Sequence, residues 1–196
     1  MTAVPSPAVV AAAILCSIVA ALPPVAARAE PADSRVFTIA EGTLSLEAPQ
    51  GWQRVQPKSG MIETEFSIPA VKGDGGGRMT VMGAGGSLQA NVDRWYGQFS
   101  QPDGSATKDK ATTKSLKIAG CSVTMVDVSG TFKDMPGGPF AGGKTIERPG
   151  YRMLAAIVET SGKGNYFLKF YGPAATVDGQ ADGFRRMIEG MVAAGR

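Results

Sequence analysis

The sequence predicts an α+β fold in which an antiparallel sheet packs against two main helices. Two apolar runs within residues 151–171 flank the compact polar turn 160–164, which is typical of a hairpin of central strands. Shorter segments with strand-like alternation precede this hairpin. Apolar residues recur at helical spacing within residues 87–100 and 175–193, so we expect helices there.

The first half of the chain is rich in short strand patterns. We expect strands at residues 36–39, 43–47, 52–56, 61–68 and 78–82. Glu41 and Gly42 stand between the first two, which predicts a hairpin. In the fourth, alternation places Phe66 on an apolar face and Glu63 and Glu65 on the opposite face, as in a half-buried strand.

Both predicted helices have one apolar side. Ser87 stands where an N-cap is expected. The apolar positions that follow it in the first helix are Leu88, Val92, Trp95 and Phe99. Those of the second helix are Phe184, Met187, Ile188, Met191 and Val192. Each stripe is wide enough to bury one side of its helix against the sheet.

Three segments lie between the helices and the hairpin. Residues 105–117 are lysine-rich and predict a solvated loop entering a strand, with a patch for an acidic partner as the alternative. Residues 121–132 predict a long strand, on which Cys121 is expected as a buried structural thiol. Residues 133–150 are rich in glycine and proline and predict an irregular loop.

The N-terminal residues predict export. An uncharged apolar run from Val9 to Ala21 has the length of a signal-peptide core and is too short to span a membrane. Ala27-Arg28-Ala29 is a small-x-small cleavage site. We therefore expect residues 1–29 to be a signal peptide and residues 30–196 to be a single exported domain, periplasmic or extracellular. Contact with a membrane is expected only if the signal is retained.

Composition excludes several kinds of function. The chain has no histidine, which excludes Ser-His-Asp and Cys-His catalysis and the histidine-containing metal sites. Cys121 would be the one cysteine left after signal cleavage, so thiolate metal clusters are excluded as well. A net charge of +3 indicates no nucleic-acid partner. We expect no cofactor, no metal and no catalytic residues.

Residues 138–145 match the phosphate-binding pattern G-x-x-x-x-G-K-[ST]. Such a loop must lead into a helix, whose first N–H groups hold the phosphates. Here Pro149 and Gly150 follow too soon after Lys144 for a helix to form. We therefore expect no nucleotide partner despite the pattern.

The pair Glu63 and Glu65 offers an enzymatic alternative. Two carboxylates on one strand face could serve a hydrolase of cell-wall or sugar material, provided that they lie in a pocket and one pKa is raised. Carboxylates at alternate positions of an exposed strand face are more often solvating charges. We favour the solvated interpretation and keep the hydrolase as the alternative function.

The order of elements resembles the PsbP-like superfamily, which includes a photosystem II accessory subunit and small secreted bacterial proteins of unknown function. The resemblance is carried by Pro49-Gln-Gly-Trp52, the Trp95 helix, the strand 166–173 and the last helix with Phe184. It implies an α/β/α sandwich with the antiparallel sheet between two helices. For function it implies a scaffold or binding role with no shared catalytic residues.

Together these observations predict an exported, non-catalytic binding or scaffold domain. Its partner would be an unidentified protein or another envelope component. Long irregular loops on rigid scaffolds often carry recognition, so loop 133–150 is the expected binding surface. Phe140, Lys144 and Arg148 are the candidate contact residues.

Overall fold

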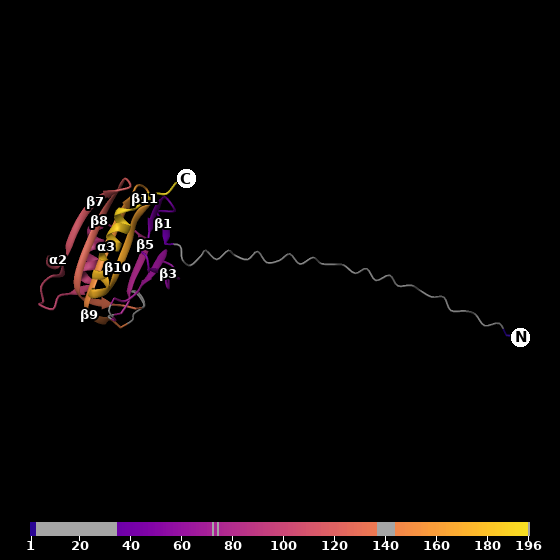
Figure 1. Ribbon diagram of the computed structural model, residues 1–196, viewed down its shortest axis with the longest axis horizontal. Coiled ribbons are helices and arrows are strands. Elements are labelled where there is room, and N and C mark those ends of the chain that lie inside the picture. Colours follow the sequence, from indigo (N-terminus) through magenta and orange to yellow (C-terminus); the bar gives the residue numbers. More distant parts are fainter. Residues whose placement is uncertain (3–34, 72, 74, 137–143, 196) are drawn as a thin grey trace.

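The core of the fold is an eight-stranded antiparallel sheet (Figure 1). A computed structural model describes residues 1–2, 35–71, 73, 75–136 and 144–195. Seven strands follow one another across the sheet: β3 (Gln53–Val55), β4 (Thr64–Ile68), β5 (Gly77–Ala84), β10 (Gly164–Pro173), β9 (Ile146–Thr160), β8 (Cys121–Asp134) and β6 (Phe99–Ser100). The eighth, β7 (Thr112–Ile118), also pairs with β8.

The predicted hairpin 151–171 is confirmed as the centre of this sheet. β10 pairs along its whole length with residues 151–160 of β9, and Gly162 in the turn and Gly164 at its end have positive φ. Side chains such as Ile157 and Leu168 are fully buried, on opposite faces of the sheet. Both faces must therefore be covered by other elements.

The two helices cover opposite faces, so the predicted α/β/α sandwich is confirmed. Helix α3 (Ala174–Glu189) packs on one face through Phe184, Met187 and Ile188. Helix α1 (Leu88–Gly97) packs on the other through Val92 and Trp95. The described core accordingly divides into two hydrophobic clusters, one on each side of the sheet.

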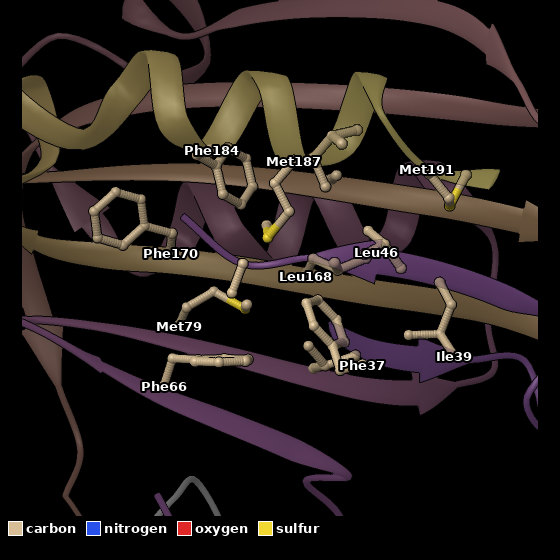
Figure 2. Close-up of a cluster of buried hydrophobic side chains, with 14 of the residues drawn as sticks. Phe37, Ile39, Leu46, Phe66, Met79, Leu168, Phe170, Phe184, Met187 and Met191 are labelled. Atoms are coloured by element: carbon tan, nitrogen blue, oxygen red, sulfur yellow. The ribbon is translucent and has the colours of Figure 1, made fainter. Parts of the chain in front are cut away.

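A small three-stranded sheet completes the α3 side. The predicted hairpin of β1 (Val36–Ile39) and β2 (Leu44–Glu47) is confirmed, and β11 (Val192–Ala193) pairs with β2. Figure 2 shows Phe37, Ile39 and Leu46 of this sheet meeting α3 and the large sheet in one cluster.

The bounds of both predicted helices need correction. The second helix ends at Glu189 rather than at residue 193, because Gly190 caps it and the chain turns into β11. The first is capped by Ser87 as predicted, since Ser87 Oγ accepts a hydrogen bond from the Ala90 N–H at 3.2 Å. It ends at Gly97, and Phe99 remains buried as part of β6.

The segment 105–117 holds more regular structure than predicted. Helix α2 (Thr107–Lys110) is a single turn, and β7 follows it directly. The lysines of this segment lie on exposed positions, which agrees with the solvated interpretation.

The predicted loop 133–150 is much shorter than expected. β8 runs on to Asp134 and β9 starts at Ile146, with Phe132 opposite Arg148. Pro149 and Gly150 belong to the predicted loop, but they lie in a β-bulge of β9 where two residues stand opposite Thr131 of β8. A bulge accepts a proline without a ladder N–H and a glycine at positive φ, and Gly150 has φ of 70°.

On the β8 side of this bulge, replacing Gly130 with alanine should strongly destabilise the fold. Gly130 has φ of 150°, and a Cβ there would stand 2.6 Å from the Ser100 carbonyl oxygen. We expect Gly130→Ala to lower the free energy of unfolding by about 2 kcal/mol, measured by urea denaturation. Gly60→Ala is the control, because a Cβ at Gly60 meets nothing within 4 Å. If the two variants were equally stable, a Cβ at residue 130 would cause no strain and the prediction would be wrong.

Candidate functional site

Beyond the end of α1, polar and aromatic side chains project from the sheet face that this helix covers. Along β10, Leu168 and Phe170 point to the α3 side, so Lys169 and Tyr171 point to the α1 side. Arg78 of β5 stands opposite Tyr171, on the same face. We call the group Arg78, Phe132, Tyr151, Lys169 and Tyr171 the basic–aromatic face; Phe132 is buried, and the other four side chains are partly exposed.

Aromatic rings surround the ammonium group of Lys169. Its Nζ lies 5.0 Å from the ring centre of Phe132 and 4.8 Å from that of Tyr171. Phe132 in turn stacks on Tyr151, with centroids 6.0 Å apart and ring planes within 9°. Nζ donates a hydrogen bond to Oε1 of Gln98, the residue that caps the C-terminus of α1.

Among the described residues, Lys169 differs from Arg78, the other cation of this face, in its lack of an ion pair and in its lowered pKa. None of the ion pairs among the described residues includes it. Burial, followed by repulsion from Arg94 and Arg78, lowers the pKa of Lys169 to about 7, while Asp134 acts in the opposite direction. A lysine whose pKa is lowered in this way can change charge near neutral pH.

Arg78 is held by a buried carboxylate. Its Nε and Nη2 donate to the two carboxylate oxygens of Glu65 at 2.8 and 2.9 Å, and Nη1 donates to the Tyr171 hydroxyl at 2.8 Å. The hydrogen bond from Arg78 lowers the pKa of Glu65 in spite of burial. Burial raises the pKa of Tyr171. The guanidinium is therefore fixed in place, although 38% of the Arg78 side chain stays exposed.

This arrangement corrects the prediction for Glu63 and Glu65. Glu65 is not a solvating charge, because only 7% of its side chain is exposed. Glu63 is exposed and precedes β4, where its Oε1 accepts the Gly83 N–H at 3.1 Å. Glu65 lies on the predicted face, but it is buried there beside Arg78, and Lys58 also acts to lower its pKa. A lowered pKa is the opposite of what a general acid needs.

The structure places the three predicted contact residues of loop 133–150 differently. Arg148 lies on β9 at the margin of the basic–aromatic face, where it pairs with Asp134 at 3.3 Å. Lys144 is exposed and lies just before β9. Phe140 lies outside the described residues. Lys169 and Tyr171 were missed because they stood in an apolar strand pattern, although a lysine within such a run was itself a signal.

The other candidate sites from the sequence provide no alternative functional site among the described residues. In the pattern 138–145 only Lys144 and Thr145 are described, and the chain enters a strand at Ile146, where phosphate binding would need a helix. A hollow of about 650 Å³ beside β3 is lined by Glu63 but not by Glu65. Cys121 is half-buried rather than fully buried.

The described residues offer neither a metal-binding group nor a helix that could span a membrane. No group of three or more acidic or cysteine side chains in these ranges could hold a metal ion. Over the same ranges, no helix has both the length and the apolar character needed to cross a membrane.

Comparison with known proteins identifies the fold. No family model and no curated protein sequence matches the chain. Among solved structures, the chain is similar to cyanobacterial PsbP (CyanoP) from Synechocystis sp. PCC 6803, with a TM-score of 0.50 and 10% identity, over 89% of this chain and 98% of that one. The predicted PsbP-like fold is thereby confirmed.

Two more solved structures match the chain at lower TM-scores. LpqN, involved in cell envelope biogenesis of Mycobacterium tuberculosis, has a TM-score of 0.48 and 12% identity, over 78% of this chain and 83% of LpqN. A protein of unknown function from Pseudomonas aeruginosa has a TM-score of 0.44 and 12% identity, over 82% and 97% of the two chains.

Proposed function

We propose that this chain, which has the PsbP-like fold, is an exported, non-catalytic domain that binds a protein or another envelope component. The partner docks on the basic–aromatic face. The observation that carries the proposal is the set of partly exposed arginine, lysine and tyrosine side chains on the sheet face that α1 covers in part.

The composition of the face suits protein recognition. Tyrosine, phenylalanine and arginine are enriched at the centres of interfaces, where large side chains with few rotatable bonds lose little entropy on binding. Arg78 and Tyr171 are already fixed by their mutual hydrogen bond and by Glu65. A partner therefore meets side chains that are ordered before binding, and less conformational entropy is lost.

The same residues favour binding over hydrolysis. The hydrolase alternative needs two carboxylates in one pocket, with one pKa raised. Glu65 is instead committed to Arg78, with a lowered pKa. The whole chain also lacks histidine, the commonest general acid and base at neutral pH.

Site-specific photo-crosslinking in the native envelope tests the docking surface. A photoreactive amino acid would replace Ser67, which is exposed beside Arg78, or Arg148 at the other margin of the face. Both positions are expected to capture the same partner. The control position is Asp182, whose side chain is 79% exposed on α3, on the opposite side of the sheet. Capture from Asp182, but from neither test position, would contradict the proposed surface.

Export is tested separately by mass spectrometry of the mature chain. We expect the N-terminus to be Glu30, because Ala27-Arg28-Ala29 fits a signal-peptidase site. Replacing Ala29 with a bulky residue such as tryptophan should leave the uncleaved chain in the membrane fraction. A mature chain that still begins at Met1 would contradict cleavage.

A further inference from the structure

The charges around Lys169 are unbalanced. Arg78 is paired with Glu65 and Arg148 with Asp134, so each of these cations has its own carboxylate. Lys169 and Arg94 occur in none of the ion pairs found among the described residues. Arg94 is exposed on α1, and its Nη2 donates to the Asn91 side-chain oxygen.

We propose that the partner presents an acidic segment to this face, and that one of its carboxylates replaces Gln98 as the hydrogen-bond acceptor of Lys169 Nζ. This inference rests on the proposed function and adds the chemistry of the partner. Gln98 is a neutral, partly exposed side chain at the end of α1, and it can turn away toward solvent. An ionised acceptor forms a shorter and stronger hydrogen bond with an ammonium than an amide oxygen does.

The surroundings favour a singly charged carboxylate over a phosphate. Lys169 and Arg94 stand on different elements, β10 and α1, so each can meet a separate carboxylate, whereas a phosphate would bring about two negative charges to Lys169 alone. The C-terminal end of α1 adds the negative pole of the helix dipole at Gln98. Lys169 and Arg94 together can balance one carboxylate from each of two acidic side chains.

Docking of a carboxylate must change the protonation of Lys169. The groups that act on its charge are Arg94 from α1, Arg78 from β5, Asp134 from β8 and Tyr171 from β10, together with burial. In the free protein these hold the pKa of the amine at about 7. A carboxylate favours the ammonium form and raises this pKa, so binding above neutral pH takes up a proton.

NMR titration of the Lys169 side chain gives a direct test. The probe is a capped tetraglutamate peptide, and capped tetraglutamine is its uncharged match. We expect tetraglutamate to raise the pKa of Lys169 by one unit or more. The dissociation constant should then rise about tenfold between pH 6 and pH 9, because one pKa unit corresponds to a tenfold change. Glutamate stays ionised across this range.

Variants distinguish binding of tetraglutamate through Lys169 from general attraction of the peptide to basic residues. Lys169→Arg keeps a cation that does not titrate, so its affinity for tetraglutamate should stay flat from pH 6 to pH 9. Lys169→Met should lose the pH-dependent part of binding. Lys114→Gln on β7 should bind like the native chain, because Lys114 is exposed and stands opposite Met125, seven residues before Phe132 along β8.

Three results would overturn the inference. These are an unchanged pKa of Lys169 at saturating tetraglutamate, an equal rise with tetraglutamine, and an equal rise with inorganic phosphate, which would make the site a general anion site. The photo-crosslinking experiment does not depend on the charge of Lys169. A partner captured from Ser67 and Arg148 would therefore keep the proposed function even if the acidic segment is wrong.

Discussion

Replacing Arg78 with methionine is expected to lower the free energy of unfolding by about 3 kcal/mol at pH 7.5. Removing one partner of a buried ion pair leaves the other charge without compensation, which costs about 3–5 kcal/mol. Glu65 is the group left behind, with 7% of its side chain exposed. The lower end of the range applies because Arg78 itself is 38% exposed.

The pH dependence of this loss follows from the pKa of Glu65. In the native chain this pKa is lowered, so Glu65 contributes stability above the unfolded value of 4.5, and this stability is lost as the pH falls through the folded value. Without Arg78 the largest remaining influence is burial, which raises the pKa against a smaller lowering by Lys58. The variant should therefore recover relative to the native chain as the pH is lowered to 4.

Urea denaturation at pH 7.5 and pH 4 measures both effects. The matched control is the double variant Glu65→Gln with Arg78→Met, which carries no buried charge and should be more stable than Arg78→Met alone at pH 7.5. A loss of the same size at both pH values would show that the deleted side chain acts by packing and not by charge.

Phe170→Ala is expected to cost about 4 kcal/mol, the largest effect in the α3-side cluster. The Phe170 side chain is fully buried on β10, between Trp52 at 5.0 Å and Phe184 at 6.0 Å between ring centroids. Truncating a buried phenylalanine removes its contacts and leaves a cavity, at a cost of about 3–5 kcal/mol.

Thermal and urea unfolding of Phe170→Ala check this value. The control is Met61→Ala, since Met61 is 59% exposed and lies outside the strands and helices. It should change stability by less than about 0.5 kcal/mol. A Phe170→Ala loss near that of the control would mean that the two aromatic neighbours close the cavity.

The sequence was sufficient for those parts of the fold that depend on local pattern. The hairpin of β9 and β10 was predictable because its strands are dense in apolar residues and its turn is polar. Ser87 was predictable as a cap because a hydroxyl before an apolar helical stripe satisfies free N–H groups. These signals depend on neighbours within a few positions along the chain.

Features that depend on distant residues were missed. The strand β11 exists because α3 brings residues 192–193 to β2, and two residues carry no strand pattern of their own. Alternation placed Glu65 on the correct face but could not reveal Arg78 beside it. Proline and glycine at 149–150 predicted a loop, whereas β8 supplies a partner strand that accommodates them in a bulge.

The candidate site, too, was predictable only where it depends on residues that are close in the sequence. Arg148 was named from composition and does lie at the margin of the basic–aromatic face. Lys169 and Tyr171 reach that face only because β10 pairs with β5, whose Arg78 stands opposite Tyr171. A single strand pattern cannot predict such a pairing, so the centre of the site was found only in the structure.

The two clusters of the sandwich give each layer its own fluorescent reporter. The chain has two tryptophans. Trp52 lies in the α3-side cluster, where its Nε1 donates to Gln180 Oε1 at 3.0 Å, and Trp95 belongs to α1 and packs against Phe167 of β10. Replacing either with phenylalanine leaves one emitter that senses a single side of the sheet. Emission from the two variants can therefore distinguish concerted melting of both layers from early detachment of α1.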